Sequence, residues 1–242
     1  MITVHFRHRL GNNLFQFAAA YALAQRTGDR LVLPPSDFAR LFGLHHGPET
    51  PAPIAPVYRD PAFTYTPIPH KLGQDICLRG YFQSEKYFAD FAEDLRELLG
   101  SYMHLAHGIE SHPGVCAVHV RRTDYVNNPH YVNLSAEYYR RLMEADPMEF
   151  LFFSDDIEFC KMKFGHMDCV SFSEERNPVK DLHKMAGCSK IIGSNSTFAW
   201  WGAWLSGHDN CVFPQEWFAG PSLRHDTRDL IPDRWIRSRS GT

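Results

Sequence analysis

Two arginines and an aspartate follow directly on a short apolar segment in the middle of the chain. Residues 115–120 are apolar and rich in β-branched side chains, which predicts a buried strand of a parallel sheet. Arg121, Arg122 and Asp124 then stand where open α/β sheets bind their ligands. A guanidinium is a planar fork of donors that matches phosphate oxygens, so the pair indicates a phosphorylated ligand. The alternative for Arg122 is a local ion pair with Asp124 that only fixes the loop.

Small polar residues follow a second apolar segment near the end of the chain. Residues 190–192 predict a strand, and a tryptophan-rich helix is expected to begin near Phe198. The turn between them offers backbone N–H groups and side-chain donors to an anion at a helix start. Ordinary N-capping explains one such residue and not four, so the turn predicts a phosphate site formed by Ser194, Asn195, Ser196 and Thr197.

Asp181 stands near the start of a helix predicted over residues 178–187. Its carboxylate can accept both the ring N–H and the amino group of a guanine. The alternative is an acid at a helix start, where the helix dipole favours negative charge. Both interpretations stay open at this point.

The second half of the chain alternates short apolar segments with helical patterns, which is typical of a parallel sheet with crossover helices. Strands are predicted over residues 115–120, 149–153, 168–172, 190–192 and 211–214. The ends of the first and fourth of these strands then lie in one sheet. Arg121 and the polar turn could hold one diphosphate there, through full charge and helix dipole together.

The first half predicts a smaller α/β domain. A strand, a turn at Gly11 and a long helix come first, and residues 34–74 are rich in proline and predict a surface excursion that would cover a cleft. Further strands and a helix are predicted over residues 31–33, 77–83 and 84–99. Residues 100–114 are polar and lack periodicity. The domain boundary is placed there, which gives domains over residues 1–110 and 111–242.

The composition is that of an ordinary globular protein, with 242 residues, 44% hydrophobic and 22% charged. A net charge of −3 argues against nucleic acid as a partner, because sequence-independent binding requires a basic surface. The six cysteines form no C-x-x-C pair, and the histidines form no three-ligand pattern, so neither a disulfide framework nor a metal site is expected. With no signal peptide and no long apolar run, we expect a cytoplasmic location without a transmembrane segment. Peripheral membrane contact stays open.

Residues 119–125, His-Val-Arg-Arg-Thr-Asp-Tyr, resemble the HxRRxDY motif of the α-1,2-fucosyltransferase family, which has a related form in α-1,6-fucosyltransferases. Residues 10–18, Leu-Gly-Asn-Asn-Leu-Phe-Gln-Phe-Ala, are similar to the start of that family, LGNQLFQYA. Further similar segments, in the same order, are residues 80–88, 153–156 and 181–201. Together they cover nearly the whole chain.

The resemblance implies a GT-B-like fold, an α/β arrangement of two Rossmann-type domains with a cleft between them. In such a fold the first domain mainly binds the acceptor and the second binds GDP-fucose. The resemblance also implies transfer of L-fucose to a galactose 2-hydroxyl, with inversion and without a metal or other cofactor. The expected partners are GDP-fucose and a galactose-terminated oligosaccharide or glycolipid precursor.

Carried over by residue, the resemblance implies that Arg121 holds the β-phosphate and that His119 supports the donor pocket, with Arg122 beside them. It likewise implies that Asp181 reads guanine and that residues 194–197 line the diphosphate. Asp155 and Asp156 lack the spacing of the metal-binding Asp-x-Asp motif of other glycosyltransferases. They predict either a loop element near the nucleotide or solvated, capping acids.

The general base is less clear, and Asp124 and His130 are the nearest titratable candidates. Thr123 stands where α-1,2 members usually carry glycine, and His8 and Arg9 stand where two glycines are common, which places bulk and charge on the expected acceptor side. Two alternatives therefore stay open. One is a fucosyltransferase of another linkage, such as α-1,6, and the other is a non-catalytic module that binds a GDP-sugar.

Overall fold

The computed structural model describes residues 1–45, 47, 55–101 and 109–241. The chain divides into two compact units, described separately below. The first unit comprises Met1–Ala106 with Asp226–Pro232, and the second comprises His107–His225 with Asp233–Thr242. The boundary expected over residues 100–114 lies partly outside the described residues. The tail was assigned to the second domain from the sequence, whereas residues 226–232 lie with the first unit.

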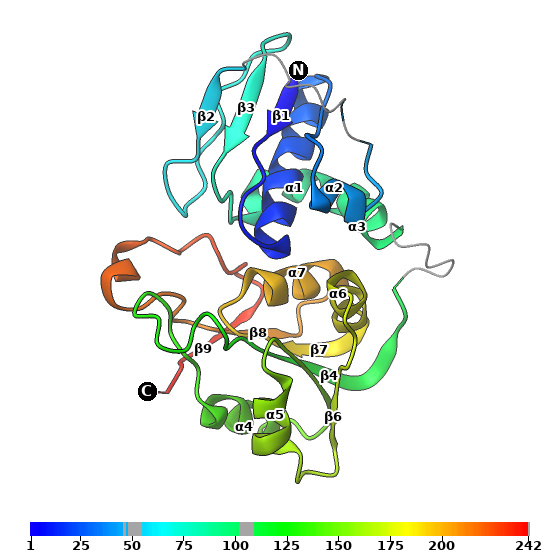
Figure 1. Ribbon diagram of the computed structural model, residues 1–242, viewed down its shortest axis with the longest axis vertical. Helices are drawn as coiled ribbons and strands as arrows, with labels where there is room; N and C mark the ends of the chain where they lie inside the picture. Colours follow the sequence, from blue (N-terminus) through cyan, green and yellow to red (C-terminus); the bar gives the residue numbers. More distant parts are fainter. Residues whose placement is uncertain (46, 48–54, 102–108, 242) are drawn as a thin grey trace. The chain divides into compact units, whose positions relative to one another are not determined.

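The first unit is built on a three-stranded parallel sheet in the order β1-β3-β2 (Figure 1). Helix α1 (Leu10–Thr27) is buried along residues 14–20, and it ends at Gly28, which adopts a left-handed φ of 70°. The remaining elements of this unit are β1 (Ile2–Val4), α2 (Asp37–Leu41), β2 (Val57–Arg59), β3 (Ile76–Arg79), the 3-10 turns η1 (Glu85–Tyr87) and η2 (Ala89–Phe91), and α3 (Ala92–Ser101).

The second unit is a six-stranded sheet in the order β6-β5-β4-β7-β8-β9, in which every neighbouring pair is parallel. Helices α4 and α5 cover one face and α6 and α7 the other (Figure 1), so the apolar central strands are buried from both sides. The strands are β4 (His112–Val120), β5 (Glu149–Ser154), β6 (Val170–Phe172), β7 (Cys188–Ile192), β8 (Cys211–Pro214) and β9 (Ile236–Ser238). The helices are α4 (Ala136–Glu144), α5 (Ile157–Phe164), α6 (Pro178–Ala186), α7 (Thr197–Ser206) and the 3-10 turn η3 (Gly220–Arg224).

The order of these strands creates a switch point beside β4. From β4 the chain adds β5 and β6 on one side, and then crosses back to add β7, β8 and β9 on the other. Val118 of β4 is paired with Phe152 of β5 and with Ile192 of β7. The carboxyl ends of β4 and β7 are therefore neighbours at the position where doubly wound sheets bind ligands. The parallel α/β fold predicted from the sequence is confirmed.

The local differences from the sequence prediction lie mainly at sheet edges. Strands β2 and β9 were not predicted, because both are short edge strands that carry exposed arginines instead of an apolar run. The strand expected over residues 31–33 is reduced to isolated bridge residues, Leu31 and Leu33, of which Leu31 pairs with Ile2. The helix expected over residues 84–99 begins as two 3-10 turns, because Phe88 adopts a non-helical φ of −145° while its ring is fully buried. Among the described helices, none has the length and hydropathy that crossing a bilayer requires.

Candidate functional site

Asp155 fixes the loop that follows β4. This residue comes directly after β5, the neighbour of β4. Its carboxylate accepts hydrogen bonds from the backbone N–H of Arg122 at 2.9 Å and from the Thr123 hydroxyl. Burial alone would raise the pKa of Asp155, but the Thr123 hydrogen bond and the Arg121 charge bring that pKa below its usual range. Asp155 is therefore ionised and serves as the anchor of the loop.

Arg121 is held by two carboxylates. Its Nη1 lies 3.1 Å from Asp155 Oδ2, and its Nη2 lies 2.6 Å from Asp124 Oδ1. Its side chain is 13% exposed, whereas that of Asp124 is 47% exposed. The guanidinium also lies over the ring of Tyr125, with its carbon 5.6 Å from the ring centroid. A planar donor group with a fixed orientation thus stands at the carboxyl end of the central strand.

Arg122 contacts a different element. Its guanidinium packs over the Phe159 ring at 3.6 Å, and its Nε lies 3.2 Å from Asp156 Oδ2. Asp156 is also the N-cap of α5, where its side chain accepts the Phe159 N–H at 3.2 Å. The ion pair considered from the sequence, Arg122 with Asp124, is thus replaced by Arg122 with Asp156, because the side chain turns toward α5. The capping role considered for Asp156 is confirmed.

His119 joins β4 to the turn after β7. Its Nδ1 lies 2.8 Å from the Ser194 Oγ, and both side chains are buried. Burial and then the Arg121 charge lower the pKa of His119 to about 4, so the imidazole is neutral at pH 7. A neutral imidazole has one donor and one acceptor nitrogen, and Ser194 occupies one of them.

The turn formed by residues 193–197, here called the Ser194 turn, leads into α7. Ser196 is the N-cap of this helix, and its side chain accepts the Phe198 N–H at 3.3 Å. The first turn of α7 contains no acidic residue, so the positive end of the helix dipole is not neutralised from within the helix. This arrangement favours an anion beside the end of β4.

Asn195 braces the Ser194 turn. Its side-chain amide donates to the carbonyls of Val132 and Trp217 at 3.0 and 2.8 Å. Its own carbonyl accepts the Tyr125 hydroxyl at 2.9 Å, and the Tyr125 ring stacks on Tyr131 at 4.2 Å. The amide hydrogens of Asn195 therefore stabilise the surrounding loops, whereas the sequence had placed this residue among the diphosphate ligands.

Asp181 lies farther along the same sheet edge, in the first turn of α6. Its Oδ1 accepts the hydroxyl hydrogen of Ser173 at 2.6 Å, and Ser173 follows β6 directly. Because β6 is two strands from β4, the ends of these strands are separated by roughly 10 Å. Burial raises the pKa of Asp181 to about 6, so the carboxylate titrates just below neutral pH.

His130 lies on the loop between β4 and α4. Its Nδ1 lies 2.8 Å from the Ser222 Oγ, and its carbonyl accepts the Ala219 N–H at 2.9 Å. These contacts join His130 to the segment around η3, whereas no contact of its side chain with Arg121 or the Ser194 turn is found among the described residues. Among the described residues, no three His, Cys, Asp or Glu side chains gather as a metal site requires.

The structure thus joins four of the predicted site residues, Arg121, Asp124, His119 and Ser194, at the ends of β4 and β7. Sequence reasoning missed two supports of this group, Asp155 as the anchor of the loop and Tyr125 as a brace of the Ser194 turn. The available signal for Asp155 was its position directly after a buried strand. Its partners lie more than thirty residues away, so the contact was not visible in the sequence.

Comparison with known proteins adds the family. Residues 57–237 match the model described as glycosyl transferase family 11. The chain belongs to glycosyl transferase family 11. This assignment confirms the family-level resemblance drawn from the sequence.

Two curated relatives of this family 11 chain illustrate its range. It is 34% identical over 179 residues to an Escherichia coli alpha-1,2-colitosyltransferase, covering 65% of this chain and 61% of that protein. It is 26% identical over 252 residues to the galactoside alpha-(1,2)-fucosyltransferase 1 of Pan troglodytes, covering 86% of this chain and 66% of that protein. The chain therefore spans less than two thirds of the length of these relatives.

Among solved structures, the family 11 chain is similar to NodZ alpha-1,6-fucosyltransferase co-crystallized with GDP. The match has a TM-score of 0.47 and 14% sequence identity, and it covers 84% of this chain and 91% of that chain.

In the first unit of the family 11 chain, the segments over residues 10–18 and 80–88 contact each other. The Gln16 amide donates to the Gly80 carbonyl at 2.9 Å, and the Gln83 amide donates to the Asn12 Oδ1 at 2.7 Å. His8, where the resemblance had led us to expect glycine, has a left-handed φ of 69°. This backbone conformation favours glycine, and the chain places an exposed histidine there.

Proposed function

We propose that the chain transfers L-fucose from GDP-fucose to the 2-hydroxyl of a galactoside, with inversion and without a metal. The observation that carries the proposal is the hydrogen bond between His119 and Ser194. Through it, a guanidinium and the positive end of α7 are held at neighbouring strand ends of the switch point. Such a pair suits the diphosphate of a nucleotide sugar.

The reaction would be a single displacement. The acceptor hydroxyl oxygen forms a bond to fucose C1 while the bond from C1 to the GDP oxygen breaks, through an oxocarbenium-like transition state. The electron pair of the broken bond leaves with GDP, so negative charge grows on the diphosphate. Arg121 and the first turn of α7 would stabilise this charge more strongly in the transition state than in the ground state. Asp155 and Asp124 orient the guanidinium in advance.

Guanine recognition is assigned to Asp181. Its carboxylate lies on the same edge of the sheet as the Arg121 loop, and a Ser173 hydrogen bond orients it. With a pKa raised to about 6, most Asp181 side chains are ionised at pH 7. The ionised carboxylate can accept the ring N–H and the amino group of guanine together.

Asp124 and His130 are the candidates for the general base that takes the proton of the attacking hydroxyl. Asp124 is favoured because its carboxylate is half-exposed and lies 2.6 Å from the guanidinium that would hold the leaving group. His130 instead pairs with Ser222.

The six cysteines are all free thiols, which supports the cytoplasmic location that forms part of this proposal.

One alternative has specific support, and the structure weakens the argument for another. The relative named as an alpha-1,2-colitosyltransferase favours colitose as a second donor sugar. Thr123 is shared with α-1,6 enzymes and had favoured another linkage, but its hydroxyl binds Asp155. Thr123 therefore has a structural role in the loop, independent of the acceptor.

The test is a transfer assay with GDP-fucose or GDP-colitose and a panel of β-galactosides, in buffer that contains EDTA. We expect a fucosylated product whose new bond, located by NMR, is α-1,2. An α-1,6 product would show that the proposed linkage is wrong, and a preference for GDP-colitose would show that the proposed donor is wrong. Saturable GDP binding with neither transfer nor donor hydrolysis would identify a binding module and overturn the enzymatic proposal.

A further inference from the structure

The three strands of the first unit all place a cationic or titratable side chain at their carboxyl ends. Arg79 of β3 and Arg59 of β2 are direct partners in the sheet. His5 continues β1, and its N–H donates to the Leu78 carbonyl at 2.9 Å. His5, Arg79 and Arg59 thus form a row across the sheet in the strand order β1-β3-β2, here called the cation row.

The cation row lies on the face of the sheet that borders a cavity of about 460 Å³. Thr3, Cys77 and Val57 line this cavity, and each is two residues before a member of the row. Residues two apart on a strand point to the same face. The cavity, which His5 also lines, has a volume in the range of small-molecule sites.

The two arginines of this row are not paired with a carboxylate in the described part of the chain, and burial and the charges of Arg7 and Arg79 lower the pKa of His5. Among the described residues, no ion pair joins a carboxylate to Arg7, Arg59 or Arg79. Burial, followed by the charges of Arg7 and Arg59, lowers the pKa of Arg79. Asp60 is adjacent to Arg59 in sequence, but its carboxylate accepts the N–H of Phe82 at 2.7 Å instead. Like charges gathered in this way repel one another, and an anion would relieve the repulsion.

Aromatic rings follow the same three strands. His8 comes after β1, Tyr81 after β3 and Phe63 after β2. The His8 and Tyr81 rings stack at 5.3 Å and 17°, and those of Tyr81 and Phe63 at 5.1 Å and 23°. The order of these rings repeats the strand order. His8 is exposed, Tyr81 is 37% exposed, and His8 holds its ring there from a left-handed backbone. A strained residue that presents a ring to solvent points to a functional role.

We propose that the carboxyl end of the first unit's sheet binds an anionic saccharide, with its carboxylate or phosphate on the cation row and a sugar ring against Tyr81 and His8. Guanidinium groups match both anions, and exposed rings offer an apolar, polarisable face to the C–H groups of a sugar. The acceptor of the reaction proposed above is therefore acidic, an inference that rests on that proposed function. The binding itself does not depend on it.

The first experiment measures binding by calorimetry. The full chain is titrated with a disaccharide of galactose and glucuronate, and with the same disaccharide after reduction of its carboxyl group. We expect the acidic form to bind at least tenfold more tightly, and the difference to shrink as salt is added. Equal affinity for the two forms would overturn the proposal.

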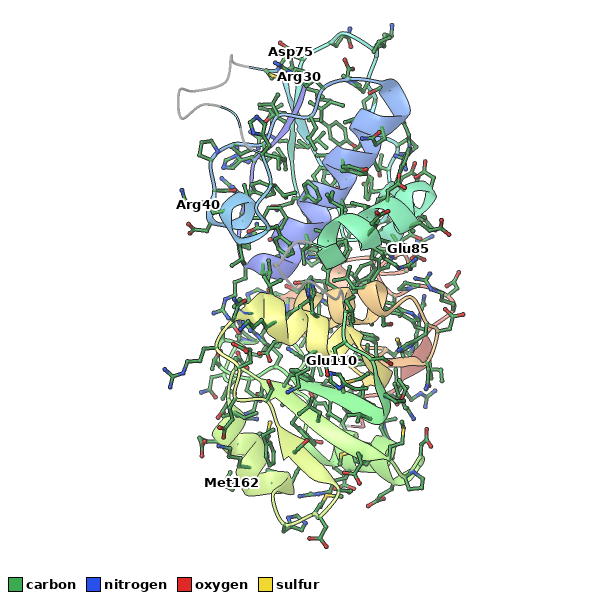
Figure 2. The ribbon with its side chains drawn as sticks, turned by 90° about the vertical axis from the view of Figure 1, so that its right-hand side faces the viewer. Arg30, Arg40, Asp75, Glu85, Glu110 and Met162 are labelled. Atoms are coloured by element: carbon green, nitrogen blue, oxygen red, sulfur yellow. The ribbon has the colours of Figure 1, made fainter. Side chains whose placement is uncertain are left out.

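Variants then locate the site. The double variant R59Q/R79Q should bind both disaccharides equally, and Tyr81→Ala should weaken both about tenfold. The matched control is R30Q/R40Q, which removes the same charge from exposed positions. The Arg30 carbonyl accepts the Ile2 N–H at the start of β1, at the opposite end of the sheet, and Arg40 lies on α2 (Figure 2). If R30Q/R40Q loses the preference for the acidic disaccharide while R59Q/R79Q keeps it, the anion does not bind at the cation row and the proposal is wrong.

Two further measurements separate this proposal from the transferase proposal. Competition by inorganic phosphate and by free glucuronate distinguishes a phosphate from a carboxylate as the natural anion. The transfer assay is then repeated with the acidic and reduced disaccharides as acceptors. Preferential binding of the acid, with neither transfer to any acceptor of the panel nor hydrolysis of GDP-fucose, would support the saccharide site and overturn the transferase proposal. Transfer to both acceptors with equal KM would overturn the inference that the acceptor is acidic, and the transferase proposal would stand. Thermal melting of each variant checks that it is folded.

Discussion

At the scale of single residues, the two ion pairs of Arg121 differ in kind. Asp155 is largely buried and is fixed by Arg122 and Thr123, whereas Asp124 is half-exposed. An incoming diphosphate can displace the exposed carboxylate more easily than the fixed one. We therefore expect Arg121 to exchange Asp124 for the ligand while Asp155 keeps the guanidinium in place. Such an exchange would also free Asp124 to act on the acceptor.

Replacing Arg121 tests its role most directly. Arg121→Lys keeps the charge but loses the planar fork, and Arg121→Ala loses both. Turnover should fall by about 100-fold or more in the alanine variant if this group acts as a preorganised donor to the leaving charge. The lysine variant should recover only part of that loss. Steady-state kcat with GDP-fucose measures both, and near-normal turnover of Arg121→Ala would remove the assignment.

Asp181 predicts a pH dependence of donor binding. Its pKa is raised to about 6, so the carboxylate is protonated below that pH and cannot accept two hydrogens from guanine. Affinity for GDP-fucose should rise between about pH 5 and 7 and then level off. The native state holds this proton more tightly than the unfolded chain, so the same ionisation should lower folding stability as the pH rises from about 4 to 6.

Calorimetry with GDP-fucose between pH 5 and 8 measures the rise in affinity, and this donor is suitable because its diphosphate has no proton to lose in that range. In Asp181→Asn the rise should disappear, and affinity at pH 7 should fall about tenfold as charge-assisted hydrogen bonds are lost. An unchanged pH profile in the variant would assign the titration to another group.

At the scale of elements, the site depends on loops from β4, β5 and β7 that hold one another. The Asp155 anchor is the contact from β5. Asp155→Asn should lower the free energy of unfolding by about 1–3 kcal/mol, because hydrogen bonds to a charged group are lost or weakened. It should also lower kcat, since Arg121 loses its fixed partner. Thermal unfolding and kcat are measured together. Asp156→Asn is the matched control, because asparagine also caps helices well.

The close approach of β7 and β8 explains the glycine at the start of the Ser194 turn. A Cβ at Gly193 would lie 2.2 Å from the Phe213 ring. Gly193→Ala should therefore destabilise the second unit by about 1–3 kcal/mol through overpacking. Adding Phe213→Leu should restore part of that loss by making room. If the double variant is less stable than the sum of the two single changes, the crowding explanation is wrong.

At the scale of the whole molecule, the last residues serve both units. Residues 226–232 belong to the first unit, where Asp229 accepts the Tyr65 N–H at 2.9 Å and lies 2.5 Å from the Lys86 ammonium. Leu230 and Ile231 are buried. The chain then adds β9 to the edge of the second sheet. The tail is thus a structural part of each unit.

Ending the chain after His225 should therefore destabilise both units at once, because it removes buried apolar residues from the first and uncovers β8 in the second. Asp229→Ala should affect the first unit alone. Hydrogen exchange, followed separately in the two units, measures these effects. Unchanged protection of the first unit in the shortened chain would contradict this account of residues 226–232.

Much of the second unit was predictable, because strands buried on both faces appear in the sequence as short apolar runs. Strands β4, β5 and β7 are of this kind, and His119, Arg121 and Ser194 follow from where they end. Strands β2 and β9 were not predictable, because exposed edge strands need no apolar pattern. The prolines before and after β2 hid it further.

The sequence by itself determined the types of the chemical groups, the parallel α/β class and the family, since each depends on local pattern and on motifs read along the chain. Only the tertiary structure decided which groups meet. Asp155 holds Arg121, Asp156 holds Arg122, and three strand ends of the first unit gather two arginines, a histidine and aromatic rings on one edge. The physical reason is that a side chain's partner is set by strand order and register, which bring together residues from distant parts of the chain.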